Sequence, residues 1–180
     1  AREQYGSAYH FLIRQAMWVV MGLAAMVAMM NMDYRLLRQP TFVFGLLLGV
    51  EVMLAGVFFL DKSHATHRWI RIGPASLQPS ELAKLALILS LAWFLEMRCR
   101  PRSFGVNDVK HTLLPAMGMV LLLAGLVVLE PDLGTALEIC VIALGMLFVA
   151  GLSQRYIWGA GVAAMPAIYL AIVRVPYRYE

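Results

Sequence analysis

Residues 68–95 read RWIRIGPASLQPSELAKLALILSLAWFL, and they decide the fold class. The second part of this stretch, residues 85–95, is an apolar run interrupted only by Ser90. The first part is polar and carries two arginines, a glutamate and a lysine. Charge at the mouth of a membrane helix costs free energy, so such a cluster usually contacts something charged. The stretch therefore predicts a membrane helix with a charged site at its entrance.

The rest of the chain has the same character. Its 180 residues are 61% hydrophobic and 14% charged, and the mean hydropathy is +0.73. Soluble domains have about 45–50% apolar and about 25% charged residues. Six apolar segments are candidate spans, at about 16–32, 41–60, 81–96, 112–129, 132–151 and 157–173. Crossing the bilayer requires about 20 helical residues, and backbone groups in lipid must be bonded within the segment. We therefore expect an all-α polytopic transmembrane helix bundle of about six spans, forming a single transmembrane domain over residues 1–180.

Two glutamates, Glu51 and Glu138, fall inside these spans. A charged residue at mid-bilayer costs about 2.5–3.5 kcal/mol on insertion scales, so each should face protein. One interpretation is a hydrogen bond between helices, and the other is a proton or ion relay.

Nucleic-acid binding and a disulfide framework are excluded. The basic run Arg98–Arg102 lacks interleaved aromatic residues and directly follows a span, which is typical of a cytoplasmic loop that sets topology. The two cysteines, Cys99 and Cys140, lie in a basic loop and in an apolar run, and neither has the partners of a metal site.

The loop 61–80 is the first candidate site. The guanidinium groups of Arg68 and Arg71 offer forked donors that match phosphate oxygens. Ser80 is expected to cap the following helix, and Glu81 and Lys84 share one helical face. These residues predict a site for an anionic headgroup. The alternative is a helix entrance in which Lys84 snorkels and the arginines contact lipid headgroups.

The turn Glu130-Pro131-Asp132 is the second candidate site. Pro131 should end one helix and force a tight reversal, and Asp132 is a good N-cap for the next helix. Paired carboxylates can also perform acid–base chemistry or hold Mg²⁺ through water molecules. A capped helical hairpin is the structural alternative.

Several motifs together resemble the SEDS family (shape, elongation, division and sporulation), which includes FtsW, RodA and SpoVE. They run along the whole chain: Tyr9–Gln15, Asp33–Arg35, Arg68–Lys84, Glu130–Ala136 and Met146–Gly151. Glu130 before Pro-Asp, with the Ala-Gly-Leu ending at Leu152, favours the FtsW division branch.

The resemblance implies a peptidoglycan glycosyltransferase that polymerises glycan strands from lipid II, with a class B penicillin-binding protein transpeptidase and other divisome or elongasome membrane proteins as partners. It implies a multi-pass protein of the bacterial inner (plasma) membrane at the division septum. The six segments would match the family's second to seventh spans, so that loop 61–80, turn 130–132 and the C-terminal end face outward.

The same resemblance implies that the chain is a fragment, truncated at both ends. The family's presumed catalytic aspartate belongs to an outer loop after the seventh span, and no residue here corresponds to it, so we expect no catalytic residue and no activity in the chain as given. Arg68, Arg71 and Lys84 would contact the diphosphate, Glu81 would hold Lys84 charged, and Gln78 and Ser80 would bond sugar or diphosphate. Glu130, Pro131 and Asp132 would have a structural or secondary role. A divalent cation, Mg²⁺ or Mn²⁺, suits this chemistry, although no metal ligands can be named. The alternatives are a lipid II flippase and a non-catalytic divisome scaffold.

Overall fold

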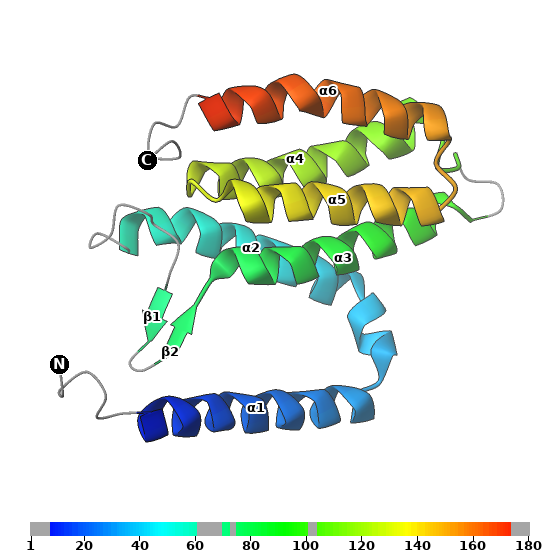
Figure 1. Ribbon diagram of the computed structural model, residues 1–180. Helices are drawn as coiled ribbons and strands as arrows, with labels where there is room; N and C mark the ends of the chain where they lie inside the picture. The colour runs from blue at the N-terminus through cyan, green and yellow to red at the C-terminus, as the bar shows by residue number, and fades with distance from the viewer. Residues whose placement is uncertain (1–7, 61–69, 73–74, 101–103, 174–180) are drawn as a thin grey trace. The chain divides into compact units, whose positions relative to one another are not determined.

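The computed structural model describes residues 8–60, 70–72, 75–100 and 104–173 (Figure 1). The chain divides into two compact units, residues 1–37 and 38–180. The first unit contains α1 (Ala8–Asn31) and most of the 3-10 turn η1 (Tyr34–Arg38). Asp33 starts this turn, because its carboxylate accepts a hydrogen bond from the backbone N–H of Arg35 at 2.9 Å.

The second unit is a bundle of five helices. They are α2 (Pro40–Leu60), α3 (Pro79–Arg98), α4 (Leu114–Leu129), α5 (Leu133–Val149) and α6 (Gln154–Val173). A π-helical turn, η2 (Val109–Leu113), leads into α4. Helix α3 packs against α2, α4 and α5, and α5 also packs against α4 and α6 (Figure 1). The pair α3 and α5 therefore forms the centre of the unit.

The core of this unit lies between α2, α3, α4 and α5. Its largest fully buried apolar side chains are leucine and isoleucine, and small residues such as Ala83 and Ala136 let the helix backbones approach. The largest of them are Leu54, Leu87, Leu91, Leu123, Ile139 and Leu147. Burial follows the helical repeat, since Ala83, Ala86, Leu87, Ser90 and Leu91 line one face of α3.

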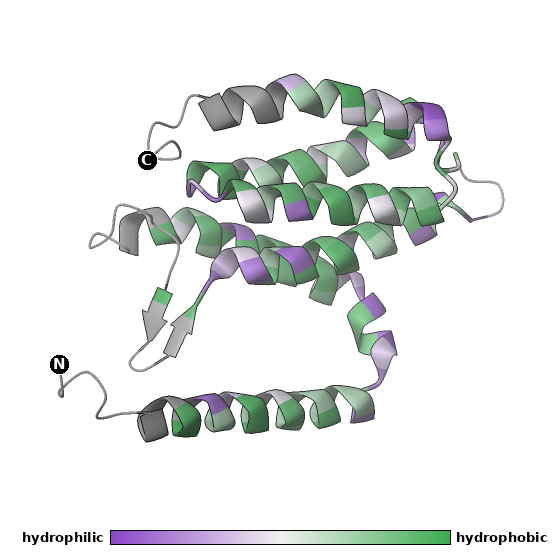
Figure 2. Ribbon diagram, in the orientation of Figure 1, coloured by the Kyte–Doolittle hydropathy of each residue, from purple (hydrophilic) through white to green (hydrophobic). Residues whose placement is uncertain are grey.

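Helices occur at all six of the predicted apolar segments, which confirms the all-α fold class. Among the described residues, two stretches are long and apolar enough to cross a membrane, Pro40–Val57 and Val109–Leu129. Gln15–Asn31 and Leu133–Val149 are apolar but shorter. Helix α3 is not among these stretches, because hydrophilic positions interrupt its hydrophobic surface (Figure 2). The division into spans and the single transmembrane domain stay predictions.

A short hairpin precedes α3. Strands β1 (Ile70–Ile72) and β2 (Ala75–Leu77) pair antiparallel, with Arg71 opposite Ser76. The described part of the loop 61–80 thus contains two paired strands, because backbone groups outside a helix need partners of their own.

The opposite end of the unit is held by loop contacts. The Asn107 amide donates to the carbonyl of Gly151 at 3.2 Å, and its oxygen accepts from the N–H and hydroxyl of Ser153, both at 2.8 Å. Gly151 has φ +99° and ends α5, with the N–H of Leu152 donating to the Leu147 carbonyl at 2.9 Å. This is a Schellman motif, and it requires the left-handed conformation that glycine adopts without strain.

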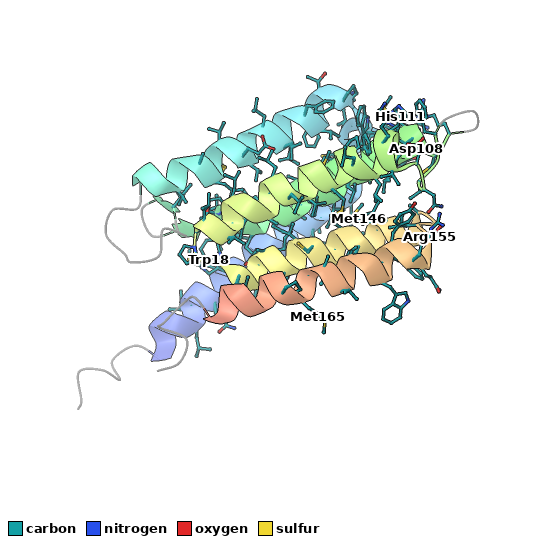
Figure 3. The ribbon with its side chains drawn as sticks, turned by 90° about the horizontal axis from the view of Figure 1, so that it is seen from above. Trp18, Asp108, His111, Met146, Arg155 and Met165 are labelled. Carbon is teal, nitrogen blue, oxygen red and sulfur yellow. The ribbon has the colours of Figure 1, made fainter. Side chains whose placement is uncertain are left out.

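Asp108 begins the turn into α4 at this same end. Its carboxylate accepts a hydrogen bond from the backbone N–H of His111 at 2.8 Å, and that bond lowers the pKa of Asp108 from its ordinary value of 3.8. The His111 ring stacks on Phe104 with centroids 4.1 Å apart. Figure 3 shows Asp108, His111 and Arg155 at one end of the helices. The loop before α4 and the turn between α5 and α6 therefore meet at one end of the bundle.

Candidate functional site

The N-terminal ends of α3 and α5 lie side by side. The Gln78 amide donates a hydrogen bond to Oδ2 of Asp132 at 3.0 Å. Gln78 immediately precedes α3, and Asp132 immediately precedes α5. Gln78 follows the hairpin, and Asp132 belongs to the turn between α4 and α5. This bond brings the two predicted candidate sites, loop 61–80 and turn 130–132, to the same end of the bundle.

Asp132 caps α5, as predicted. Its Oδ1 accepts from the backbone N–H of Thr135 at 3.2 Å, and its Oδ2 accepts from the Thr135 hydroxyl at 2.9 Å. Glu130 at the end of α4 is fully buried, and its N–H donates to the carbonyls of Leu126 and Val127. Helix α4 ends at Leu129 and α5 begins at Leu133, so the predicted tight reversal around Pro131 is confirmed.

Lys84 is the centre of the site. Its Nζ lies 2.9 Å from the carboxylate oxygens of Glu81 and 2.8 Å from Oε2 of Glu138. The Lys84 side chain is 19% exposed, whereas those of Glu81 and Glu138 are 57% and 60% exposed. The pair of Glu81 and Lys84 on one face of α3 is therefore confirmed, and α5 adds a second carboxylate to it.

The two connections between α3 and α5 have the same spacing. Gln78 pairs with Asp132 and Lys84 pairs with Glu138, and both pairs are separated by 54 residues. Two pairs with one offset mean that the helices run parallel and in register. Their N-terminal ends, which carry partial positive charge, therefore lie at the same end of the bundle.

The other predicted site residues have mixed outcomes. Arg68 lies outside the described residues, and Arg71 is placed only by its backbone in β1. Ser80 is wrong as a helix cap: α3 begins earlier, at Pro79, since proline suits the first helical position. Ser80 is fully buried, and its hydroxyl has no hydrogen-bond partner among the described residues.

Glu138 is the member of this cluster that sequence reasoning did not connect to the site. Its place within a span was the available signal, and the interpretation as an interhelical hydrogen bond is confirmed by its contact with Lys84. Glu51 of α2 is half-buried, and its side chain makes no hydrogen bond or ion pair with the described residues. In the part of the chain that the structure describes, no group of three His, Cys, Asp or Glu side chains could hold a metal ion.

Comparison with known proteins agrees with this architecture. A profile of the FtsW/RodA/SpoVE proteins, described as cell cycle protein, matches residues 1–180. The probable peptidoglycan glycosyltransferase FtsW of Geobacter metallireducens is 35% identical over 99% of this chain and 47% of that protein. The protein of the same name from Trichlorobacter lovleyi is 33% identical over 100% of this chain and 46% of that protein. The chain thus spans about half the length of the curated relatives it matches.

Two solved structures are similar in fold as well. One is a chain from work on structural coordination of polymerization and crosslinking by a peptidoglycan synthase complex; its TM-score is 0.75 at 30% identity, over 96% of this chain and 51% of that one. The other is the rod shape determining protein RodA of Thermus thermophilus, with a TM-score of 0.68 at 31% identity, over 87% of this chain and 50% of that one. With a profile match along its whole length and this likeness in structure, the chain belongs to the FtsW/RodA/SpoVE family of cell cycle proteins.

Proposed function

We propose that the protein carrying this chain is a peptidoglycan glycosyltransferase that polymerises glycan strands from lipid II in the bacterial inner membrane. The names of its relatives support the reaction class. The similarity to a chain of a peptidoglycan synthase complex supports a class B penicillin-binding protein as partner. The end of the bundle that carries the hairpin, Gln78 and Asp132 would face outward, where the donor's sugar is located.

The observation that carries this proposal is the position of Lys84. It is the one cation among the described side chains that links the parallel helices α3 and α5, in the second turn of each, and two carboxylates hold it there. Glycosyl transfer from a polyprenyl diphosphate leaves negative charge on the departing diphosphate, and a fixed cation stabilises that charge.

The chain's own residues would then bind and orient the donor. Lys84 contacts the diphosphate, and Arg68 and Arg71 add cationic groups from the loop 61–80. Gln78 lies at the N-terminal end of α3, close enough to bond the sugar or the diphosphate. The acceptor hydroxyl needs a general base, and no described residue is assigned to that role. Asp132, which accepts three hydrogen bonds, serves to hold α5 in place.

The test is Lys84→Ala in the full-length protein, purified in detergent and supplied with lipid II. We expect loss of glycan strands on a gel, with unchanged membrane insertion and yield. Lys110→Ala is the matched control, because Lys110 is an exposed lysine in η2, before the N-terminal end of α4 and so at the opposite end of the bundle, and it should polymerise normally. Normal polymer from Lys84→Ala would refute the assignment of Lys84.

The same assay separates the enzyme from the two alternatives. Detergent micelles offer no second compartment, so a flippase would yield no product there, whereas a polymerase would yield strands. A scaffold would yield none either, and growth of cells carrying Lys84→Ala would then be normal.

A further inference from the structure

The charges around Lys84 conflict with simple anion binding. One ammonium group lies within hydrogen-bond distance of two carboxylates, so with Glu81 and Glu138 ionised the triad carries one net negative charge. An approaching diphosphate would be repelled by this arrangement. Lys84 can therefore bind an anionic ligand only if one carboxylate gives way.

The geometry identifies which carboxylate is more firmly placed. Glu81 and Lys84 lie three residues apart on α3, so helix geometry keeps them adjacent. Glu81 also lies in the first turn of α3, whose N-terminus has no side-chain cap and favours a negative charge.

Glu138 has neither advantage. It lies on a different helix, its side chain is 60% exposed, and Lys84 is its one hydrogen-bond and ion-pair partner in the described chain. The N-terminus of α5 is already occupied by Asp132. An exposed carboxylate with a single partner can rotate away from Lys84 without breaking any other side-chain contact among the described residues.

Resting on the proposed function, we infer that Glu138 is a built-in counter-ion that the diphosphate of the lipid-linked donor displaces from Lys84. Such a counter-ion also determines specificity. A phospholipid has one phosphodiester charge, so its attraction to Lys84 is no stronger than that of the Glu138 carboxylate it must replace. A diphosphate has more negative charge, so its attraction to Lys84 is stronger. Glu138 thus keeps Lys84 paired in the empty site and selects for diphosphate-linked lipids over the anionic lipids of the membrane.

The test uses Glu138→Gln in the full-length protein, which removes the charge and keeps the shape. We expect the KM for lipid II to fall by about two- to fivefold, as for loss of one competing charge at a part-exposed site, with kcat little changed. Phosphatidylglycerol should become a competitive inhibitor at concentrations that leave the parent protein unaffected. Glu51→Gln, which also removes a carboxylate from a span, is the control and should change neither quantity.

The outcomes distinguish this inference from the function on which it rests. Binding of fluorescent lipid II to the detergent-purified protein gives the dissociation constant whether or not strands are made. Tighter binding by Glu138→Gln without any polymer would support the counter-ion and reject the polymerase. An unchanged or weaker affinity would overturn the counter-ion even if the parent protein polymerises. Should Glu138→Gln fold poorly, Glu138→Asp keeps the charge on a shorter side chain and should give an intermediate affinity, and parent-like affinity from it would count against displacement.

Discussion

Asp132 connects two helices through one carboxylate, and its removal should be costly. Replacing a helix N-cap aspartate with alanine typically destabilises by about 1 kcal/mol. Asp132→Ala also removes the acceptor of the Gln78 amide, and a net hydrogen bond is worth about 0.5–1.5 kcal/mol. Thr135 is 8% exposed, so its hydroxyl would lose its partner in a buried place. The expected loss of unfolding free energy is therefore about 2–3 kcal/mol.

The assay is reversible unfolding of the full-length protein in mixed micelles, with a thermal melt alongside. A loss of this size corresponds to roughly 4–12 °C in Tm for a chain of 150–250 residues, and to a smaller shift in the longer full-length protein. Asp33→Ala is the matched control, because the Asp33 carboxylate accepts from the nearby Arg35 N–H in an exposed turn, and it should cost about 0.5 kcal/mol or less.

A double-mutant cycle isolates the bond between helices. Gln78→Ala and Asp132→Ala should show a coupling of roughly 1 kcal/mol, since their side chains share one hydrogen bond. A coupling indistinguishable from zero, or a total loss below about 1 kcal/mol, would refute the reasoning that this bond ties α3 to α5.

Two further predictions concern the opposite end of the bundle. Gly151→Ala should lower the unfolding free energy by about 1 kcal/mol, because a left-handed conformation strains any side chain. Gly145→Ala inside α5 is the control and should not lower it, because the added methyl group meets open space. Equal effects of the two substitutions in denaturant titration would contradict this prediction. Asp108 has a folded pKa below its unfolded value, so its contribution is full above the ordinary pKa of 3.8 and is lost as pH falls through the folded pKa. Asp108→Asn should therefore flatten the decline of stability in that acid range, and a parallel decline would argue against it.

Much of the fold follows from local rules. The apolar runs are long enough to predict the helices, and Asp132 followed by an apolar segment identifies the start of α5. Local rules also explain the error at Ser80. Serine and proline are both signals for a helix start, and the proline at the first helical position prevails because its ring already has the required φ.

The sequence predicts only part of the site, the pair of Glu81 and Lys84, and not the contact of Lys84 with Glu138. Glu81 and Lys84 are neighbours on one helix, so their pairing follows from spacing alone. Glu138 reaches Lys84 only because α3 and α5 pack in register, and that register arises from the buried residues between them, such as Leu87 and Ile139. No local pattern encodes a contact over 54 residues.

The shared offset of the two α3–α5 pairs has a consequence for how the chain tolerates changes in length. An extra residue between Arg98 and Asp108 would lengthen a loop and leave both pairs able to form. An extra residue between Gln78 and Lys84, or between Asp132 and Glu138, would turn one partner about 100° around its helix axis. Insertions and deletions should therefore be tolerated between residues 98 and 108. They should be rare between residues 78 and 84 and between residues 132 and 138, so these two short stretches should have a fixed length.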